Sequence, residues 1–390
     1  MKEIYIGLVK LFSTIYKNRS PRKVIYLMSF SGNEEFILKL NAVLKKKNIS
    51  FEVLSLNSCK KSANKLTDKG VKVTFFADGL SFLLNHLKKI MESKLLICDN
   101  YYAFLAGCNF DHDKTHIVQI WHANGAIKTF GWEEPRTQQR SKADKKRFQK
   151  VYNQFDEYIV GSNKMATVFA NSYHEPLTKM NVIGYPRTDE LFDQSWRLNT
   201  RKDIYQKYPE LMEKEVILYA PTYREDKNGK PTLNLPTDFN KLFDYLSEDQ
   251  RIIIKLHPHL KEQELKLKEE IKNTNVVWIN DFKTNDLLLV TDRLVTDYSS
   301  IIFDYSLLKN AKQMLFFCYD LKEYQKEVGI QSDFEEWIPG KLVNTTVELI
   351  NHLKSPITQT DFTEFNKKWN TCNDGNSTQR VIENERKYFE

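Results

Sequence analysis

The stretch Leu294–Leu308, which reads LVTDYSSIIFDYSLL, shows the pattern that decides the fold. A short apolar run ends at Thr296, the polar residues 297–300 follow it, and an apolar helix is expected from Ile301 to Leu308. A buried strand that passes through a short turn into a helix is the building unit of parallel α/β sheets. Because the ligands of such sheets bind beyond the carboxyl ends of the strands, we examine the residues that close each strand for function.

Twelve short apolar runs, several of them rich in β-branched residues, alternate with helix-compatible segments along the chain. Most are continuously apolar, which is typical of strands buried on both faces. Seven lie at or before Gly184 and five follow Lys214, so the segment 186–213 is the predicted domain connection. We therefore expect two α/β domains of similar size that face each other across a cleft. The predicted strands are 24–29, 51–56, 71–77, 95–99, 116–121, 157–161, 180–184, 215–221, 251–256, 276–280, 293–297 and 314–319.

The composition permits two such domains and excludes several classes of protein. With 390 residues, of which 41% are apolar, the chain is long enough for two cores and too apolar for large-scale disorder. The five cysteines are scattered and form no C-x-x-C pair, so we expect reduced thiols in a cytosolic protein. No apolar run approaches about 18 residues and no secretory signal is visible, so no membrane span is expected. The net charge of +7 is a mild excess whose placement matters more than its size.

Three predicted strands in the second half end on residues that could bind an anion. They lead into Pro221-Thr222-Tyr223-Arg224, into His257-Pro258-His259 and into Asp297-Tyr298-Ser299-Ser300. If these strands share one parallel sheet, an arginine, a histidine pair and two hydroxyls meet at one edge. We then expect a phosphate site there, with Arg224 making a two-pronged contact. Taken alone, either serine would be interpreted as an ordinary helix N-cap.

Other kinds of site have little support in the sequence. His257 and His259 could hold a metal, but no cysteine or third ligand lies at a recognised spacing, so no bound metal is expected. His112 and His116 are interpreted as part of a solvated loop, because Asp111 and Asp113 accompany them. The glycine-rich dinucleotide motif, the P-loop and the G-x-S-x-G elbow do not occur.

The first half has one unusual strand end. The apolar run 116–120 leads into Trp121-His122-Ala123-Asn124-Gly125, and seven of the fifteen residues in 136–150 are basic. By itself His122 would be interpreted as a hydrogen-bonded core histidine, and the basic run as a solvated helix face. The basic residues of this run are Arg136, Arg140, Lys142, Lys145, Lys146, Arg147 and Lys150.

Residues 1–23 are predicted to contain an amphipathic helix. They carry six basic residues, Arg19 among them, against one acid, Glu3. Such a helix can lie on an anionic membrane surface, or it can pack on its own domain. The apolar residues expected to contact a membrane are Ile4, Leu8, Leu11, Phe12 and Ile15.

Several of these segments resemble one family, the CDP-glycerol glycerophosphotransferases of wall teichoic acid synthesis. The resemblance covers about residues 95–345 and is most specific in 293–324. It implies two facing Rossmann-like domains, the GT-B arrangement, and transfer of glycerol phosphate to a lipid-linked acceptor at the inner face of a Gram-positive bacterial membrane. The segments that carry it are WHANGAIKTFG (121–131), GYPRTDEL (184–191), APTYRED (220–226), KLHPH (255–259) and VTDYSSIIFDYSLLKNAKQMLFFCYDLKEY (295–324).

One departure within the resemblance points to a branch of the family. Polymerases of the family read W-H-G-T where this chain has Trp121-His122-Ala123-Asn124, and the variant looks more like the primase branch. The function implied is addition of the first glycerol phosphate to an undecaprenyl-diphosphate-linked disaccharide, with release of CMP. The alternatives are a transferase of later glycerol- or ribitol-phosphate units, a GT-B glycosyltransferase that uses a nucleotide sugar, and a non-catalytic nucleotide- or membrane-binding module.

The resemblance also implies roles for particular residues. His122, or else His257, would deprotonate the acceptor hydroxyl. Gly125 would let the backbone pass close to substrate, and the basic run would face an anionic lipid surface or the acceptor's diphosphate. The residues expected to bind substrate are Tyr223, Arg224, Thr296, Asp297, Ser299, Ser300 and Gly125, and those expected to face the membrane or the acceptor include Arg140, Lys142, Lys145, Lys146 and Arg147.

The expected organisation follows from these roles. Residues 1–23 form a membrane-surface helix, 24–190 an acceptor-side domain and 191–390 a domain that binds CDP-glycerol. The protein is expected to be peripheral at the cytoplasmic face of the membrane, where other teichoic acid synthesis enzymes could be partners. CDP-glycerol is a substrate, so no cofactor is expected, and no nucleic-acid partner is expected because the basic residues accompany no recognised motif.

Overall fold

The computed structural model describes residues 2–17, 21–226 and 228–389, and the chain forms two compact units. The first unit comprises residues 1–124, 130–190 and 369–390, and the second comprises 125–129 and 191–368. Arg19, one of the basic residues expected beside the amphipathic helix, lies outside the described residues.

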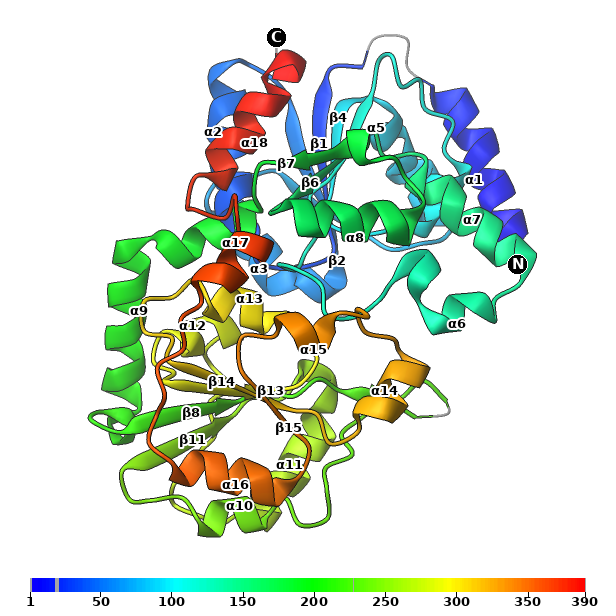
Figure 1. Cartoon of the computed structure of the whole chain (residues 1–390). Coiled ribbons are helices and arrows are strands. Elements are labelled where there is room, and N and C mark those ends of the chain that lie inside the picture. The colour runs from blue at the N-terminus through cyan, green and yellow to red at the C-terminus, as the bar shows by residue number, and fades with distance from the viewer. Residues whose placement is uncertain (1, 18–20, 227, 390) are drawn as a thin grey trace. The chain divides into compact units, whose positions relative to one another are not determined.

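The first unit is built on a parallel sheet of seven strands in the order β3-β2-β1-β4-β5-β6-β7 (Figure 1). Its central strands are buried on both faces, which agrees with their continuous apolar sequences. The strands are β1 (Lys23–Met28), β2 (Phe51–Leu56), β3 (Val73–Phe76), β4 (Ser93–Cys98), β5 (His116–Gln119), β6 (Glu157–Val160) and β7 (Met180–Val182).

Helices connect these strands and complete the core of the first unit. Val24, Tyr26 and Met28 of β1 belong to one apolar cluster with Phe36 and Leu40 of the helix that follows. The α-helices are α1 (Lys2–Tyr16), α2 (Glu34–Lys46), α3 (Lys60–Asp68), α4 (Leu80–Asn85), α5 (Leu87–Met91), α6 (Pro135–Gln138), α7 (Lys142–Tyr152), α8 (Asn163–Tyr173) and α18 (Ser377–Asn384). Short 3-10 helices are η1 (Asn57–Cys59), η2 (Ala103–Gly107), η3 (Gly131–Glu133), η4 (Leu177–Lys179), η5 (Pro186–Phe192) and η8 (Glu385–Phe389).

The second unit is built on a parallel sheet of six strands in the order β12-β11-β8-β13-β14-β15, with a separate antiparallel ribbon of β9 and β10. The strands are β8 (Glu215–Tyr219), β9 (Arg224–Glu225), β10 (Pro231–Thr232), β11 (Gln250–Ile254), β12 (Val276–Val277), β13 (Arg293–Thr296), β14 (Gln313–Phe317) and β15 (Lys341–Val343). The helices are α9 (Gln194–Lys207), η6 (Pro209–Leu211), α10 (Lys241–Asp244), η7 (Pro258–Leu260), α11 (Lys261–Glu270), α12 (Thr284–Leu288), α13 (Ile301–Tyr305), α14 (Leu321–Glu327), α15 (Phe334–Trp337), α16 (Thr346–Lys354) and α17 (Thr363–Trp369).

The structure confirms the α/β class, the two Rossmann-like domains and all twelve predicted strands. The sequence patterns did not indicate β9, β10 and β15, which are only two or three residues long. The helix expected over 301–308 ends at Tyr305. There the Ser306 hydroxyl donates to the carbonyl of Phe303 at 2.9 Å, and such side-chain bonds compete with helix continuation.

The carboxyl-terminal segment corrects the expected domain limits. The sequence patterns assigned 191–390 to one domain, but residues 369–390 return to the first unit, where α18 packs against α2. In the opposite direction, residues 125–129 belong to the second unit. Both exchanges depend on contacts between distant parts of the chain, which local sequence patterns do not report.

No helix in the described part of the chain is long and apolar enough to cross a membrane.

Candidate functional site

The sheet of the second unit brings the three predicted strand ends together. Strand β8 lies between β11 and β13, and all three run parallel. Tyr219 of β8 lies opposite Ile254 on one side and Val295 on the other. The residues that follow these strands therefore share one edge of the sheet, as the sequence predicted.

Arg224 does reach this edge, but its guanidinium is already engaged. Its Nε and Nη2 donate to both oxygens of Asp320 at 2.6 and 2.9 Å, and its Nη1 donates to Asp297 at 3.0 Å. The side chain is buried and lies over the ring of Tyr324. Burial lowers the pKa of Arg224, but the two carboxylates outweigh this effect and raise it. The expected two-pronged phosphate contact would require the guanidinium to leave Asp320, so in this structure Arg224 positions the loop and does not present a free fork.

Thr296 and Asp297 are likewise occupied by protein partners. The Thr296 hydroxyl donates to the carbonyl of Ala220 at 2.6 Å, which links β13 to the residue after β8. One oxygen of Asp297 accepts from the backbone N–H groups of Thr222 and Tyr298 at 2.8 and 2.7 Å. Both side chains are buried and fix the shape of the edge, and their direct contact with substrate stays a prediction.

Ser299 and Ser300 are partly exposed at this edge. Ser300 precedes α13 but makes no side-chain cap hydrogen bond, and Ser299 accepts only a long one, 3.4 Å, from the N–H of Ile301. The ordinary N-cap interpretation therefore does not account for Ser300. The two hydroxyls are placed to donate to a bound anion.

His257 and Tyr223 form the neighbouring part of the edge. Their ring centroids lie 5.0 Å apart, and the Nδ1 of His257 accepts a 3.3 Å hydrogen bond from the N–H of His259. Partial shielding from water, His259 and the positive charge of Lys128 all lower the pKa of His257. His257 is thus expected to be neutral near pH 7, and because its Nδ1 accepts from the protein, its Nε2 carries the hydrogen and can donate it to a ligand oxygen.

Lys128 is a residue that the sequence patterns did not single out. It belongs to the second unit, its Nζ lies 5.6 Å from the ring centroid of Tyr324, and its backbone pairs with Ile330. Among the described residues, no carboxylate oxygen lies within 4 Å of its Nζ. Burial lowers its pKa, and Asp297 partly offsets this shift. The sequence feature that could have identified Lys128 is its position three residues after Gly125, within the motif segment 121–131.

Gly125 has a structural reason to be glycine. Its φ is +64°, and a Cβ at this position would meet the ring of Phe303 at 2.5 Å. A close approach of the backbone to the protein's own Phe303 therefore accounts for the glycine. The expected close approach to substrate is not needed to explain it.

In the first unit, His122 lies just after the carboxyl end of β5. Its ring stacks on Phe30 with centroids 3.7 Å apart, and its Nδ1 lies 3.0 Å from the carbonyl oxygen of Asp99. Because a carbonyl only accepts, Nδ1 carries the hydrogen and Nε2 keeps a lone pair. Nε2 makes no hydrogen bond with the described residues. Burial, with the charge of Arg187 adding to it, lowers the pKa of His122 to about 4.

The backbone next to His122 has an uncommon conformation, and the neighbouring loop is held by hydrogen bonds. Trp121 has a φ of +57°, which is rare for a bulky residue and costs strain energy. Asp99 holds the loop that contains Ser29 and Phe30. Its carboxylate accepts from the N–H groups of these two residues and from the hydroxyl of Tyr102. Burial raises the pKa of Asp99 to about 6. The sequence patterns did not single out Asp99, although it directly follows the core of a predicted strand.

Asn124, part of the motif variant, faces the protein interior. Its amide donates to Asn370 at 2.9 Å and accepts from Asn373 at 3.0 Å, and none of it is exposed. Asn373 in turn accepts from the N–H of Tyr185 at 2.8 Å. The variant residue therefore anchors the carboxyl-terminal segment to the first unit.

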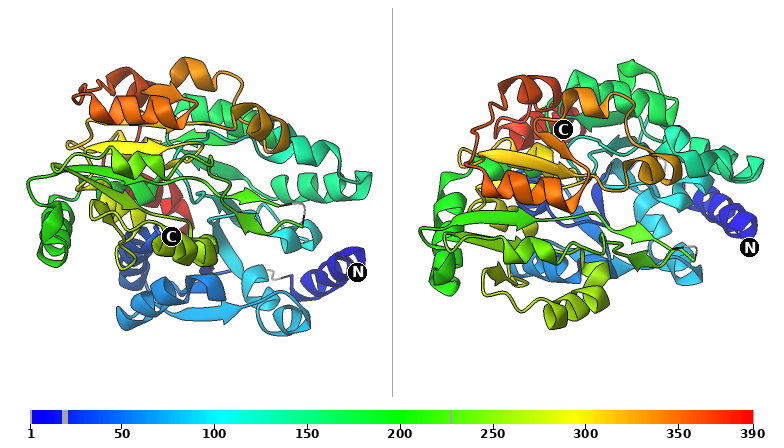
Figure 2. Two further views of the ribbon diagram at one scale, coloured as in Figure 1. Left: turned by 90° about the horizontal axis from the view of Figure 1, so that it is seen from below. Right: turned by 60° about the horizontal axis from the view of Figure 1, so that its bottom comes forward.

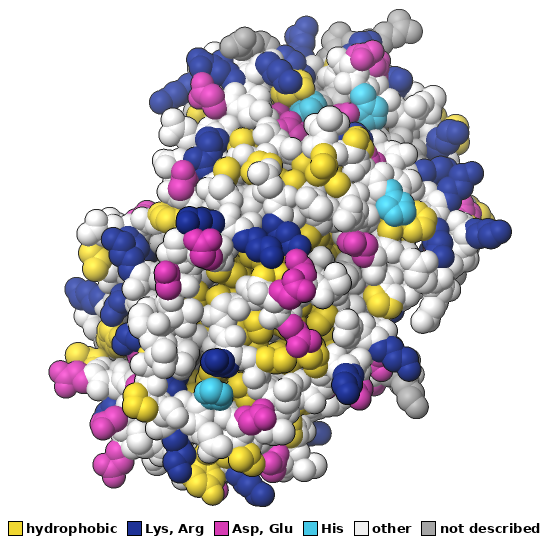
Figure 3. Space-filling model, viewed as in Figure 1, with side chains coloured by type: hydrophobic (Ala, Val, Ile, Leu, Met, Phe, Trp, Pro, Cys, Tyr) yellow, Lys and Arg dark blue, Asp and Glu magenta, His cyan; other side chains and the backbone are white. Residues whose placement is uncertain are grey.

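The amphipathic helix and the basic run, predicted separately, lie side by side. Arg147 of α7 pairs with Glu3 of α1, and both helices pack on η2 (Figures 1 and 2). Val9 and Ser13 of α1 are buried against the unit, whereas the opposite side of the helix is open. Lys and Arg side chains gather over this region of the first unit (Figure 3). The exposed apolar residues of α1 are Ile4, Leu11 and Ile15, at 69%, 57% and 66% exposure, while Leu8 and Phe12 are half-buried.

The structure corrects one interpretation of a histidine pair. His112 does lie in an exposed turn, where its Nδ1 is 2.8 Å from Asp156. His116, however, begins β5 and is largely buried, with its Nε2 3.1 Å from a carboxylate oxygen of Glu157. A solvated loop therefore describes only the first of the two.

Comparisons with known proteins agree with the sequence motifs. A family model described as CDP-glycerol:poly(glycerophosphate) glycerophosphotransferase matches residues 14–384. A teichoic acid glycerol-phosphate primase of Bacillus spizizenii is 32% identical over 382 residues, 97% of this chain and 96% of that protein. Another, of Bacillus subtilis, is 33% identical over 300 residues, 77% of this chain and 75% of that protein.

Solved structures agree on the fold. The wall teichoic acid polymerase TagF superposes with a TM-score of 0.73 at 20% identity, covering 99% of this chain and 94% of that one. A UDP-GlcNAc 2-epimerase from Neisseria meningitidis gives a TM-score of 0.55 at 12% identity, covering 94% of this chain and all of that one. The motif resemblance, including the resemblance to the primase branch, is confirmed by the family and primase matches.

Proposed function

The chain belongs to the CDP-glycerol:poly(glycerophosphate) glycerophosphotransferase family, and from this premise we propose that it acts as a teichoic acid glycerol-phosphate primase. It transfers glycerol phosphate from CDP-glycerol to an undecaprenyl-diphosphate-linked disaccharide and releases CMP. The observation that carries the proposal is the 32% identity to a named primase over nearly the whole of both chains.

The donor's diphosphate is held by the edge of the second unit. Groups there with capacity left for a ligand include the hydroxyls of Ser299 and Ser300, the ring of His257 and the ammonium of Lys128. Arg224 holds Asp297 and Asp320, and so keeps the loop that presents the serines in place. Charge-assisted contacts to phosphate oxygens stabilise the negative charge that develops as CMP departs.

His122 acts as the base of the first unit. Its Nε2 takes the proton of the acceptor hydroxyl while the hydroxyl oxygen bonds to the β-phosphorus of CDP-glycerol. The bond from that phosphorus to the bridging oxygen breaks, and the electron pair leaves with CMP. The low pKa of His122 keeps the imidazole neutral at pH 7, so Nε2 is available for the proton at the moment of attack. Arg187, whose charge acts on the His122 ring, is suited to face the acceptor's anionic diphosphate.

The lipid-linked acceptor cannot leave the bilayer, so the enzyme docks on the membrane. The exposed stripe of Ile4, Leu11 and Ile15 on α1 inserts its side chains, and the basic residues of α7 next to it attract anionic lipid. A hollow of about 390 Å³ beside α1, lined by Tyr5, Ile6 and others, offers apolar surface for part of the lipid. The cytoplasmic face is the expected side, because nucleotide-activated donors such as CDP-glycerol are made and used inside the cell.

The test is a reaction with defined substrates. The full chain is incubated with CDP-glycerol and a lipid-linked disaccharide analogue. The release of CMP is followed by chromatography, and the mass of the lipid product is measured by mass spectrometry. One added glycerol phosphate per acceptor supports a primase, whereas a ladder of additions indicates a polymerase. A ribitol-phosphate primase of Bacillus spizizenii is also related, at 29% identity, so a parallel reaction with CDP-ribitol decides the donor. Transfer from a UDP-sugar in place of either donor contradicts the proposal.

A further inference from the structure

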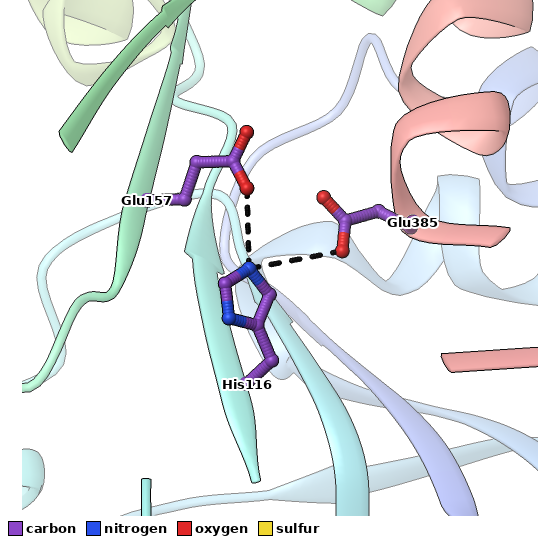
Figure 4. A group of neighbouring side chains, drawn as sticks. All are labelled: His116, Glu157 and Glu385. Carbon is purple, nitrogen blue, oxygen red and sulfur yellow. Dashed lines mark hydrogen bonds and ion pairs between the residues drawn. The ribbon is translucent and has the colours of Figure 1, made fainter. Parts of the chain in front are cut away.

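The amino edge of the first sheet carries a cluster that the proposed reaction does not use. His116 begins β5, Glu157 begins the neighbouring strand β6, and Glu385 begins η8 in the carboxyl-terminal segment (Figure 4). One ligand atom from each, His116 Nε2 and two carboxylate oxygens, lies within 4.8 Å of the others. This is the one such group of three in residues 2–17, 21–226 and 228–389.

Two asparagines aim the carboxylates at the histidine. Glu157 Oε1 accepts from the amides of Asn181 and Asn384 at 2.6 and 2.9 Å. Glu385 Oε1 accepts from the same Asn384 amide at 2.8 Å. The remaining oxygens, both Oε2, therefore face His116 Nε2, at 3.1 Å from Glu157 and 3.8 Å from Glu385 (Figure 4). Partners that fix the far oxygen of each carboxylate are a regular feature of metal sites.

Glu385 supplies an independent observation that points to a ligand. Its side chain is only 2% exposed, and its Oε2 has no hydrogen-bond partner among the described residues. An unpartnered buried carboxylate oxygen is costly, and a cation between Glu385 and His116 would satisfy it.

The two distances to His116 fit a single ion. Ligand atoms at about 2.1 Å from a tetrahedral ion lie about 3.4 Å from each other, which falls between the two distances to His116. The His116 ring is held by stacking on Tyr388, with centroids 4.6 Å apart at 12°, and its Nδ1 lies 3.8 Å from Asp156. The ion would replace the proton on Nε2, and the Nδ1–H would then face the Asp156 carboxylate. The side chains of His116 and Glu157 remain 14% and 15% exposed, which leaves a route for the ion and a position for water.

We propose that His116, Glu157 and Glu385 bind one divalent transition-metal ion of the Zn²⁺ class. One imidazole nitrogen with two carboxylates suits such an ion, whereas Mg²⁺ and Ca²⁺ prefer all-oxygen sites. The ion fastens the carboxyl-terminal segment to β5 and β6. Its role is structural, because the cluster lies at the amino edge of the sheet and His122 lies beyond the carboxyl edge of the same strand.

The experiment measures metal binding directly, without an activity assay. The full chain without a histidine tag is stripped with a chelator, and Zn²⁺ is titrated in competition with a chromophoric chelator. The expected result is one equivalent of tight binding, and a Co²⁺ titration should give visible absorption bands of a low-coordinate site. Glu385→Gln and Glu157→Gln each keep the side-chain shape and should weaken Zn²⁺ binding by at least about tenfold. Glu175→Gln is the matched control, since Glu175 is a buried carboxylate of the same unit that pairs with Lys179.

A second readout guards against misfolded variants. Zn²⁺ should raise the thermal midpoint of the wild type and of Glu175→Gln, because an ion that binds only the folded chain stabilises it. The same addition should raise the midpoints of Glu385→Gln and Glu157→Gln by much less. No stoichiometric binding by the wild type, or equal binding by all four proteins, overturns the proposal and leaves a metal-free cluster in which His116 shares a proton with the carboxylates. Binding of Mg²⁺ in preference to Zn²⁺ overturns the assignment of the ion.

Discussion

His116 and His122, at opposite ends of strand β5, differ in whether the protein already occupies their ring nitrogens. His116 Nε2 faces two carboxylates at the amino edge of the sheet. His122 Nε2, past the carboxyl edge, meets no hydrogen-bonding partner in the described part of the chain, while its Nδ1 is fixed by the carbonyl of Asp99. A group enclosed by side chains of the protein joins segments of the fold, whereas a group with one atom left open can act on a substrate.

The second unit repeats the same contrast with two cations. Arg224 is saturated by Asp297 and Asp320, whereas Lys128 has no carboxylate within 4 Å in the described residues. The family resemblance drew attention to Arg224, and the geometry draws it to Lys128. The distinction between occupied and open groups has measurable consequences for catalysis, stability, pH dependence and membrane binding.

The strongest test removes the open nitrogen of His122. His122→Gln should lower kcat by about 10²- to 10⁴-fold, since this is the usual contribution of a general base. The dissociation constant of CDP-glycerol, measured by calorimetry, should not change. His352→Gln, a partly buried histidine of α16, serves as the control and should keep full activity. Loss of donor binding in parallel with kcat would move His122 to the donor side or to a structural role.

The two cations of the second unit should respond in opposite ways. Lys128→Met should lower kcat/KM about 30-fold at an unchanged thermal midpoint, because one charge-assisted phosphate contact of about 2 kcal/mol is lost. Arg224→Lys should lower the thermal midpoint, because an ammonium cannot replace the paired contact with Asp320. An Arg224→Lys protein of normal stability but without donor binding would restore the direct phosphate role that the sequence suggested.

The surroundings of His122 should be visible in the pH dependence. Its pKa is about 4 in the folded chain and about 6.5 in an unfolded one, so between these values the unfolded chain binds the extra proton. The free energy of unfolding therefore falls as pH is lowered from about 6.5 to about 4, and kcat should stay level down to about pH 5 before it falls.

Comparison with His122→Gln isolates this contribution. Asp99, whose pKa is raised to about 6, acts in the opposite direction over nearly the same range, so the wild-type curve alone does not resolve the two. From denaturant titrations of both proteins between pH 4 and 8, the free energy of unfolding of the wild type minus that of His122→Gln should fall as pH is lowered from about 6.5 to about 4. If kcat instead begins to fall near pH 6.5, the His122 ring is solvated, and the contrast with His116 is lost.

The smallest expected effect concerns the exposed side of α1. Replacing Ile4, Leu11 and Ile15 together by asparagine should weaken pelleting with anionic vesicles several-fold, while CDP-glycerol affinity stays normal. Raising the salt concentration should release part of the wild-type protein from the vesicles, because salt screens the charges of the basic residues of α7. The matched control replaces Leu198, Leu265 and Val347, which are also exposed and apolar. Equal pelleting of both triple variants would assign docking to the basic residues alone.

The two sheets and the residues at their carboxyl edges follow from local sequence patterns. Continuous apolar runs are buried on both faces wherever they form, so all twelve predicted strands occur. The residues that follow parallel strands lie at one edge of the sheet. His122, His257 and the serine pair could therefore be identified as candidate site residues from the sequence alone. The motifs could also identify the family, because they lie in those same loops.

Which of these side chains already have a hydrogen-bond or charge partner depends on tertiary contacts. Asp320 is far from Arg224 in the sequence, and Glu385 is farther still from His116, yet each pair meets in the fold. The structure also places Lys128 with the second unit and returns residues 369–390 to the first. A local pattern reports which residues a strand presents, but the partners that use up a hydrogen bond or a charge come from distant segments, and their positions follow from how the whole chain packs.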